Sequence, residues 1–304
     1  MSYRSNFERV LSEGKFAVTA EIGPPKGSDP NTIRHKAEHL RGYADAFNIT
    51  DNQTAVVRMA SIAGCSLLLT MKIEPIMQIT CRDRNRIALQ SDILGAAAIG
   101  IRNILCLTGD HQSFGNHPTA KGVYDIDSIQ LIQIVKNMRD KGIFQSGDEL
   151  LAGKPAVVIG AAANPFAEPY ELRVDRLEKK IRAGADFIQT QSVYNLDRFN
   201  AWMDDVRSRG LDKKVHIIPG VTPLKSLKMT ERMKYHVPGV DVPDTIEKRM
   251  KTAKDPKQEG YKIALELMRE VQTIKGVHGI HITALFWETI IPDLVKEAGL
   301  YPRP

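Results

Sequence analysis

The chain has 304 residues, of which 42% are hydrophobic, and its formal net charge is +6 with a pI of about 9.1. This hydrophobic content is sufficient for a buried core, which excludes a wholly disordered chain. No apolar run reaches the roughly 18 residues of a membrane span, and residues 1–14 lack the apolar segment of a signal peptide. We therefore expect a soluble, cytoplasmic protein with no membrane partner.

The basic residues are scattered, and the densest run, 248–257, mixes Lys and Arg with Asp and Met, as a solvated helix end does. A mildly basic surface favours anionic ligands such as phosphates or a polyglutamyl tail. The three cysteines, Cys65, Cys81 and Cys106, are widely separated and lack the Cys or His spacing of a zinc site. The sequence thus predicts buried thiols, no nucleic-acid partner and no metal site.

Short apolar runs of β-forming residues recur through the whole chain. Their near-continuous hydrophobic character is typical of strands buried on both faces, as a parallel sheet requires. The eight predicted strands are 16–21, 46–50, 75–80, 103–108, 156–160, 186–191, 215–220 and 279–283.

Helical patterns fill most of the intervals between these strands. Asp29 and Pro30 are the predicted N-cap and first residue of a helix with the inward stripe Ile33, Ala37 and Leu40. After the third strand, Asp83 is the predicted cap of the next helix. Further predicted stripes are Ile87, Ser91, Leu94 and Ala98; Ile129, Ile132, Val135 and Met138; and Leu177 with Ile181.

Eight strands that alternate with helices predict a (β/α)8 TIM barrel, formed as a single domain by residues 1–304. The longer intervals after the fourth and seventh strands predict loop insertions there. A doubly wound open sheet is the alternative, but no Gly-x-Gly-x-x-Gly follows the first strand, which disfavours a dinucleotide-binding domain of that kind.

Polar residues stand at the ends of the apolar strands, where the active site of a TIM barrel lies. Glu21 is the most informative, because burying a carboxylate costs several kcal/mol unless it is paired. The polar strand ends are Glu21; Thr50 and Asp51; Gln78 and Thr80; Thr108 and Asp110; Asn164; Gln189 and Gln191; Thr222; and Thr283.

Four of these strand ends carry recognisable motifs. They are TAEIGPP at the first strand, NILCLTGD at the fourth, AGADFIQTQ at the sixth and HIIPGVTP at the seventh. In this order they resemble the motifs S-F-E-F-F-P-P, I-x-x-L-R-G-D, A-G-A-x-x-x-x-T-Q and I-I-P-G-I-x-P of the methylenetetrahydrofolate reductase family. The resemblance spans nearly the whole chain.

The resemblance implies a flavin-binding barrel that reduces 5,10-methylenetetrahydrofolate to 5-methyltetrahydrofolate, with hydride delivered from flavin N5. It implies that Glu21 is the general acid and that Asp110 tunes the flavin and stabilises a cationic intermediate. Gln191 would contact the pterin, and Lys180 would lie near the phosphate end of the flavin. The implied cofactor-binding residues are Thr50, Gln78, Thr108, Gly109, Asp110, Tyr124, Asn164 and Lys180, and the implied substrate-binding residues are Glu21, Gln191 and Leu227.

The sequence departs from the family at several of these positions. The residues concerned are Thr108 in place of Arg, Gln78 in place of His, Asn164–Pro165 in place of Tyr-Pro, Leu227 in place of a nicotinamide-stacking aromatic, and Trp287 in place of Arg. The cofactor is therefore a flavin, FAD by resemblance with FMN as the alternative. The electron donor is either NAD(P)H or a partner protein that carries an iron–sulfur centre or a flavin. Such a partner would make the protein a hetero-oligomer, and a homo-oligomer stays open.

Each of these functional roles has a purely structural alternative. Glu21 could pair with a lysine, Asp110 could belong to a plain turn, and Lys180 could be a solvated helix lysine; one of Gln189 and Gln191 could merely satisfy the core. The histidines His111, His117, His278 and His281 are taken as structural, and Trp287 is expected to pack on the barrel. Two other functions stay open: a pterin-dependent methyl or pteroate transferase without flavin, and a non-catalytic electron-transfer or scaffold subunit.

Overall fold

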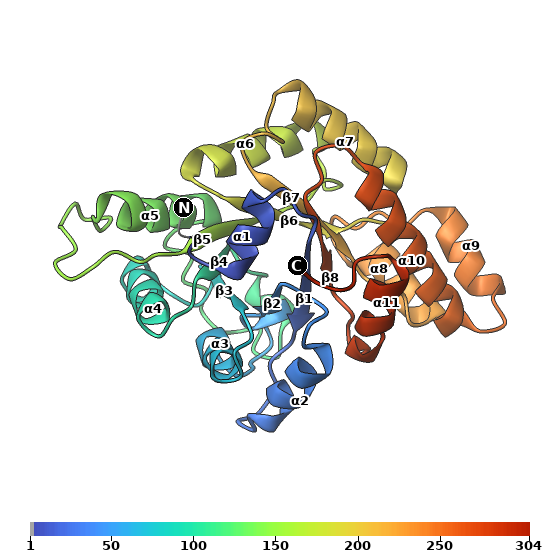
Figure 1. Ribbon diagram of the computed structural model, residues 1–304, viewed down its shortest axis with the longest axis horizontal. Helices are drawn as coiled ribbons and strands as arrows, with labels where there is room; N and C mark the ends of the chain where they lie inside the picture. Colours follow the sequence, from blue (N-terminus) through green and yellow to red (C-terminus); the bar gives the residue numbers. More distant parts are fainter. Residues whose placement is uncertain (1–2) are drawn as a thin grey trace.

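The computed structural model describes residues 3–304, in which eight parallel strands close into a barrel in chain order (Figure 1). The predicted TIM barrel is confirmed. The strands are β1 Ala17–Ile22, β2 Ala46–Ile49, β3 Pro75–Thr80, β4 Asn103–Leu107, β5 Val158–Ala163, β6 Phe187–Ser192, β7 His216–Val221 and β8 Gly279–Ile282. The fifth strand begins and ends later than predicted, so that Ala162 and Ala163 extend it to the mouth of the barrel.

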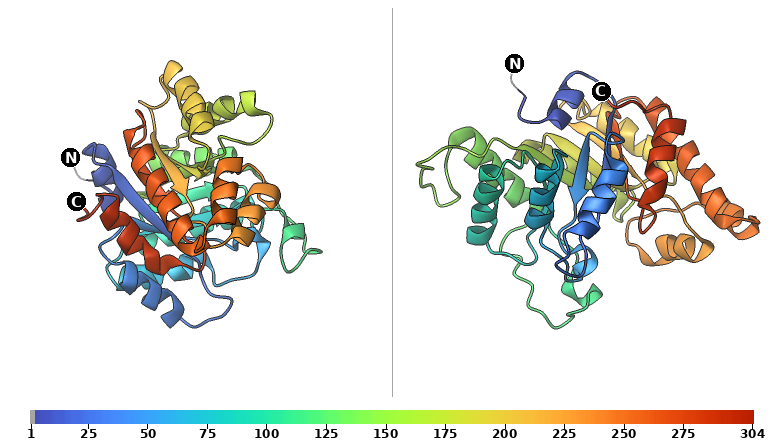
Figure 2. Two further views of the ribbon diagram at one scale, coloured as in Figure 1. Left: turned by 90° about the vertical axis from the view of Figure 1, so that its right-hand side faces the viewer. Right: turned by 60° about the horizontal axis from the view of Figure 1, so that its bottom comes forward.

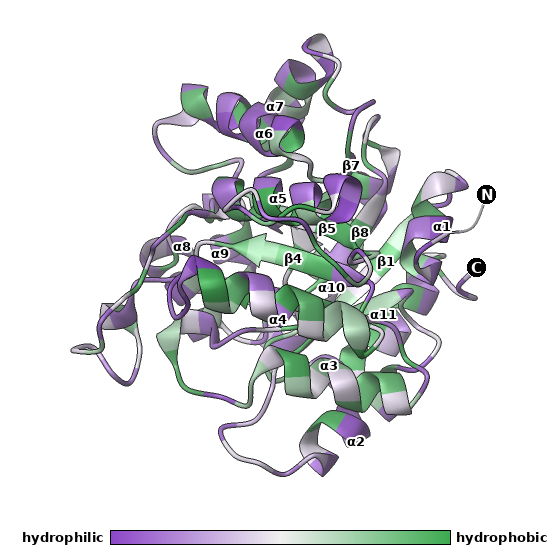
Figure 3. Cartoon of the chain, turned by 90° about the vertical axis from the view of Figure 1, so that its left-hand side faces the viewer, coloured by the Kyte–Doolittle hydropathy of each residue, from purple (hydrophilic) through white to green (hydrophobic). Residues whose placement is uncertain are grey.

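Helices surround the strands. They are α1 Asn6–Ser12, α2 Asn31–Leu40, α3 Ser61–Thr70, α4 Arg86–Ala98, α5 Ser128–Lys136, α6 Arg173–Ala183, α7 Leu196–Ser208, α8 Leu227–His236, α9 Asp244–Thr252, α10 Pro256–Thr273 and α11 Ile291–Glu297. Short turns are η1 Gln53–Ala55, η2 Gln112–Phe114, η3 Asn137–Lys141, η4 Tyr170–Leu172 and η5 Glu288–Ile290. In Figure 3 the arrow of β4 has the green of hydrophobic residues, whereas much of the ribbon of α6 has the purple of hydrophilic ones. No described helix has both the length and the apolar character that crossing a membrane would require.

The core lies inside the barrel and between the strands and the helices. The predicted stripe Ile33, Ala37 and Leu40 is buried on α2, which confirms that prediction. Asp29 accepts a hydrogen bond from the Asn31 amide, although Pro30 lies just outside the helix. The three cysteines and the indole of Trp287 are also buried, as expected.

The prediction for α4 was wrong at its start and on its face. Asn85 caps this helix by accepting hydrogen bonds from the amides of Ile87 and Ala88, whereas Asp83 pairs with Arg82. The buried face consists of Leu89, Ile93 and Ala96, and Ile87 is 74% exposed. Apolar residues occur on every side of this helix, so its sequence fits either of two buried faces. The helix begins two residues later than predicted, and the face that is buried is the one not predicted.

Two insertions shape the mouth. The interval after β4 is a long loop with η2, and its Gly115 packs directly on the loop after β2, since an added Cβ would lie 1.7 Å from the Ala55 carbonyl oxygen. The interval after β7 contains three helices, α8, α9 and α10. Gly239, between α8 and α9 and at φ +74°, approaches Asn164 so closely that a Cβ would lie 1.8 Å from its amide nitrogen. The rim of the mouth is therefore held together by contacts between loops that follow non-adjacent strands, β2 with β4 and β5 with β7.

Helix α1 closes the opposite end of the barrel, which we call the floor. Phe7 is fully buried there and packs edge-to-face on Phe187, with ring centroids 5.1 Å apart. Glu74 accepts hydrogen bonds from the amides of Asn6 and Phe7, and Ser5 donates to Asn103. The C-terminus also lies at this end (Figure 2), where Arg9 of α1 donates to the Pro304 carbonyl at 3.2 Å. The mouth is thus the end at which ligands can enter.

Candidate active site

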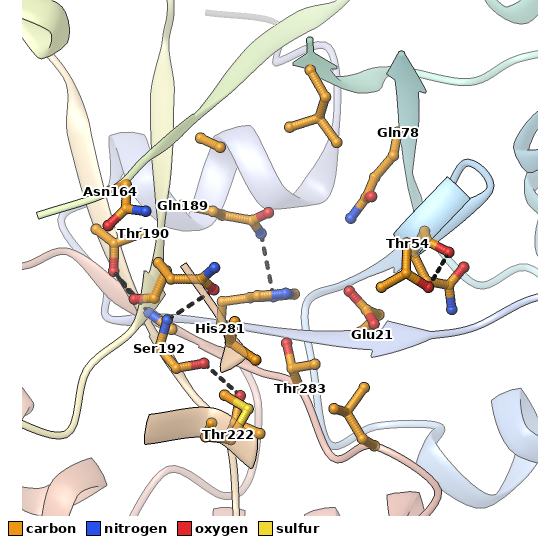
Figure 4. Close-up of a pocket in the computed structure, with 18 of the residues that line it drawn as sticks. Glu21, Thr54, Gln78, Asn164, Gln189, Thr190, Ser192, Thr222, His281 and Thr283 are labelled. Carbon is orange, nitrogen blue, oxygen red and sulfur yellow. Dashed lines mark hydrogen bonds between the residues drawn. The ribbon is translucent and has the colours of Figure 1, made fainter. Parts of the chain in front are cut away.

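A cavity of about 1110 Å³ opens at the carboxyl ends of the strands, where the active site of a TIM barrel is found. Its apolar walls come from side chains such as Leu105, Leu107, Leu177 and Met229. Figure 4 shows Glu21, Gln78, Gln189, His281 and Thr283 around this space; they come from β1, β3, β6 and the end of β8. Glu21, Gln78, Thr108, Asn164, Lys180 and Gln191 are the residues predicted for the site that line the cavity.

Glu21 is the carboxylate of this cavity. It is the only Asp or Glu among the described lining residues, and within residues 3–304 its carboxylate has no hydrogen-bond partner. Burial raises the pKa of Glu21 to about 7, and the negative charge of Glu288 adds to the rise against the opposing charges of Lys36 and Arg58. A carboxyl group of this kind exists partly in its protonated form near neutral pH and can donate a proton.

Gln189 belongs to a buried network below the cavity. Its amide oxygen accepts from Asn48 at 2.7 Å, and its amide nitrogen donates to the Thr19 hydroxyl at 3.1 Å. The same hydroxyl lies 2.9 Å from Nδ1 of His281, and burial lowers the pKa of His281 to about 4. His281 is therefore a neutral ring fixed by the core that also lines the cavity, a placement that the sequence did not indicate.

Gln191 lies where the pairing of β6 with β7 becomes irregular between Gln189 and Ser192. Irregularities of this kind redirect side chains and recur next to active sites. The amide oxygen of Gln191 accepts only from the Ser192 amide, at 3.2 Å, and its amide nitrogen has no partner among the described residues. Ser192 in turn bonds Thr222 at 2.6 Å. Gln191 thus presents a free donor to the cavity, whereas Gln189 does not.

A row of cations on α6 lines one wall. Arg173, Arg176 and Lys180 project from successive turns of this helix into the cavity. Lys180 donates to the Ala162 carbonyl at 2.5 Å, and burial, helped by the positive charge of Arg176, lowers its pKa to about 8. Arg176 makes no ion pair with any described residue. We call these three residues the α6 row.

A second set of cations comes from the segment that follows β7. Lys225, Lys228 and Arg232, which we call the α8 row, line the cavity, and neither Lys228 nor Arg232 has an ionic partner within residues 3–304. The α8 row was missed by sequence analysis, as were Arg173 and Arg176. Only the spacing of basic residues on one helix face could have indicated them, and that spacing is also typical of a solvated helix.

Five predicted site residues do not line the cavity. Thr50 is buried and donates to Gln53, and Leu227 packs against the core at the start of α8. Asp110 accepts a hydrogen bond from the Thr54 amide at 2.9 Å, and its carbonyl accepts one from the Tyr124 hydroxyl at 3.1 Å. Asp110 therefore fixes Thr54, which does line the cavity, and Gly109 and Tyr124 belong to the same rim.

The loops after β2 and β3 are held by paired charges. Asp51 is buried and accepts from the Thr80 amide at 2.9 Å and from Arg84 at 2.7 Å. Arg82, also buried, pairs with Asp83 and donates to the carbonyl of Asp110. Within residues 3–304, no group of three His, Cys, Asp or Glu side chains is arranged to hold a metal ion.

Comparison with known proteins agrees with this geometry. Residues 6–299 match the family model described as methylenetetrahydrofolate reductase. The chain is 28% identical over 243 residues to methylenetetrahydrofolate reductase 2 of Schizosaccharomyces pombe, which covers 76% of this chain and 37% of that protein. It is 25% identical over 226 residues to the 5,10-methylenetetrahydrofolate reductase of Pectobacterium carotovorum, and this match covers 72% of this chain and 68% of that protein. The chain thus spans well under half of the yeast relative.

Among solved structures, an uncharacterized protein from Clostridium thermocellum has a similar fold, with a TM-score of 0.64 and 16% identity over 98% of both chains. That protein binds two copies of 5-methyl-5,6,7,8-tetrahydrofolic acid. At this identity the likeness concerns the fold alone. The match over residues 6–299, together with a barrel that carries the motifs at its strand ends, shows that the chain belongs to the methylenetetrahydrofolate reductase family.

Proposed function

We propose that this chain is the catalytic barrel of a flavin-dependent reductase that converts 5,10-methylenetetrahydrofolate into 5-methyltetrahydrofolate. The observation that carries the proposal is Glu21, a carboxyl group with a pKa near 7 and no hydrogen-bond partner among the described residues, which faces a large cavity with apolar walls. Reduction of a methylene bridged between two nitrogens needs an acid at one nitrogen and a hydride at the carbon, and Glu21 is suited to the first task.

The residues of the cavity fit a flavin. Its volume of about 1110 Å³ is large enough for a flavin together with a pterin, and its apolar walls suit flat ring systems. The α6 row offers positive charge for phosphate, with Arg176 unpaired and Lys180 partly buried. Three cations match a diphosphate better than one phosphate, so we propose FAD rather than FMN.

Gln191 and the α8 row are the proposed folate contacts. The free amide nitrogen of Gln191 can donate to an acceptor on the pterin ring. The α8 row lies in the same cavity and would attract the carboxylates at the glutamate end of the folate. The folate bound by the structural relative from Clostridium thermocellum supports this assignment, because it is a ligand of the same class on the same fold.

The proposed chemistry divides between the chain and its cofactor. Glu21 donates its proton to a folate nitrogen, which opens the bridged ring, and the bound flavin supplies the hydride. Asp110 acts from the rim, where it holds Thr54 against the cavity and contributes a negative charge that offsets the cationic substrate. Gln78 and Thr283, which also line the cavity, orient the ligand rings.

The electron donor is the least constrained part of the proposal. Leu227 packs into the core, so it does not provide the surface on which a nicotinamide would stack. Phe286 is an aromatic side chain at the mouth that is 80% exposed and lines the cavity. We propose Phe286 as the stacking residue for NAD(P)H; a donor protein with an iron–sulfur centre or a flavin is the second candidate.

The decisive experiment begins with the visible spectrum of the purified protein. We expect flavin absorption, release of FAD on heating, and reoxidation of the pre-reduced protein by methylenetetrahydrofolate. A colourless protein that still transfers a methyl group would favour the transferase. Bound flavin without any reaction with folate would favour an electron-transfer or scaffold subunit. Bleaching by NADH alone tests whether a partner protein is needed.

A further inference from the structure

A second, smaller cavity lies behind Glu21. Its volume is about 200 Å³, and its walls come from the segment after β1, helix α2 and the segment after β8. We call it the side chamber. The residues that line both the side chamber and the main cavity are Glu21, Gln53, Arg58, Thr283, Leu285 and Phe286. Glu21 therefore stands in the partition between two spaces.

An ion pair forms the far wall of the side chamber. Lys36 of α2 pairs with Glu288 of η5, and the two side chains are 29% and 16% exposed, so the pair lies between the chamber and solvent. The buried Nε of Arg58 has no hydrogen-bond partner among the described residues. Together with Glu21, Lys36 and Glu288, this unsatisfied donor provides partners for water molecules, and the side chamber is large enough to hold them.

Charged groups lie near Glu21 on both sides of the partition. Glu288 and Lys36 face it across the side chamber, and Arg58 faces it from the loop after η1. His281 and Lys26 lie on the side of the main cavity. Glu288 disfavours the ionised form of Glu21, and the two cations favour it. The charge balance at Glu21 is thus set mainly from the side chamber.

We propose that Glu21 regains its proton through the side chamber, and that Lys36 and Glu288 are positioning residues with opposite effects on it: Glu288 keeps Glu21 protonated before it reacts, and Lys36 limits that effect. The inference rests on the proposed function. In each turnover the Glu21 O–H bond breaks as an N–H bond forms on the folate, and a solvent proton then restores the carboxyl group. No electrons move in that second step. With flavin and folate filling the main cavity, water reaches the carboxylate from behind.

Neutralising Glu288 and Lys36 in separate variants tests their effect on the protonation of Glu21. In Glu288→Gln the remaining Lys36 stabilises the carboxylate, so the midpoint of Glu21 protonation should fall by about one pH unit; in Lys36→Met it should rise by a similar amount. The double variant should return towards wild type. The measurement is an infrared pH titration of the protonated carboxyl band, assigned by its loss in Glu21→Gln. The same shifts should appear in the pH profile of flavin reoxidation by folate.

A larger side chain in the side chamber tests whether protons reach Glu21 through it. Thr32 lines the side chamber, whereas His35 lies on the exposed side of the same helix. Thr32→Phe should leave the rate of the first flavin reoxidation unchanged. It should slow the subsequent uptake of a proton by Glu21 at least tenfold. An indicator dye follows this uptake in the presence of excess 5-methyl product. His35→Phe should leave both unchanged.

Two results would overturn the inference: shifts of the same sign, or none, in the two charge variants, and wild-type proton uptake in Thr32→Phe. The infrared titration needs no turnover. Absence of any reaction with folate would therefore count against the proposed function, while the titration still decides the role of the pair.

Discussion

Two regions of the mouth treat charge in opposite ways. In the loops after β2 and β3, each buried charge is paired with a more exposed partner: Asp51 contacts Arg84, and Arg82 contacts Asp83. In the α6 and α8 rows, Arg176, Lys228 and Arg232 line the cavity without an ionic partner in the described chain. The paired region satisfies its own charges and holds the loops in place. The unpaired region leaves its positive charges available for an anion, as the proposed flavin and folate sites require.

Glu21 lies between these regions, and its loss should have the largest effect. Glu21→Gln keeps the size of the side chain but removes the acidic proton. Reoxidation of pre-reduced flavin by methylenetetrahydrofolate should fall by roughly 10²–10⁴-fold, as is typical for a lost general acid. Single-turnover mixing measures this step. Flavin binding and reduction should survive, and a Gln variant that reoxidises at the wild-type rate would make Glu21 structural.

Breaking the paired region should cost stability. Asp51→Ala leaves Arg84 uncompensated and removes acceptors from the Thr80 amide and hydroxyl, which should lower the free energy of unfolding by about 3–5 kcal/mol. Asp92→Ala is the matched control, because Asp92 is the partly exposed second partner of Arg84; it should cost less than about 1 kcal/mol. Denaturant titration measures both. Equal losses would show that burial does not distinguish the two pairs.

Glu21 should also destabilise the fold at neutral pH. Its pKa is about 7 in the folded chain against 4.5 in the unfolded chain, so the folded state binds the proton more tightly and stability falls as pH rises between these values. Glu21→Gln should therefore be more stable at pH 7.5 by up to about 3 kcal/mol, less where solvent reaches the carboxylate. The difference should vanish near pH 4. A gain that is independent of pH would have another cause.

Removing cations that have no ionic partner in the described chain should lower the affinity for ligands and leave the fold unchanged. Arg176→Ala and Lys180→Ala should each raise the dissociation constant of the flavin by roughly 10–100-fold, the usual worth of a charge-assisted hydrogen bond. Lys179→Ala on the exposed side of α6 controls for the loss of a positive charge. Titration of the apoprotein with FAD and FMN also compares the two cofactors. Unchanged affinity in both variants would remove the α6 row from the flavin site.

The smallest effect is expected in the α8 row. Lys228→Ala and Arg232→Ala should raise KM roughly 2–10-fold for folates with several glutamates and little for the monoglutamate, since exposed charges interact weakly in water. The difference should shrink at high salt. Lys251→Ala on α9 is a control away from the cavity. A uniform effect on all chain lengths would contradict a glutamate-binding role.

The barrel and its strand ends could be predicted from sequence, because buried parallel strands are continuous apolar runs and the polar residue that ends each run is visible. Glu21 and Gln191 were found in this way. Helix starts were less certain: both Asp83 and Asn85 are acceptable caps, and only the packing of Leu89 and Ile93 selects Asn85.

Contacts between distant segments could not be predicted. The α6 and α8 rows are separated by roughly fifty residues, and each alone has the pattern of a solvated helix. Glu288 and Lys36 meet only because α2 and η5 are neighbours across the closure of the barrel. Likewise, Asp110 lies in the loop that follows β4, and its carboxylate accepts from the Thr54 amide of another loop.

The floor of the barrel has a consequence for the order of folding. Helix α1 is synthesised before the strands that it contacts: its Phe7 packs on Phe187 of β6, and its N-cap Ser5 donates to Asn103 of β4. Contacts between segments so far apart in sequence form slowly, because the intervening chain must first be brought together. Helix α1 can therefore dock on the floor only after most of the strands have been synthesised. Until then its apolar residues have no barrel to pack against.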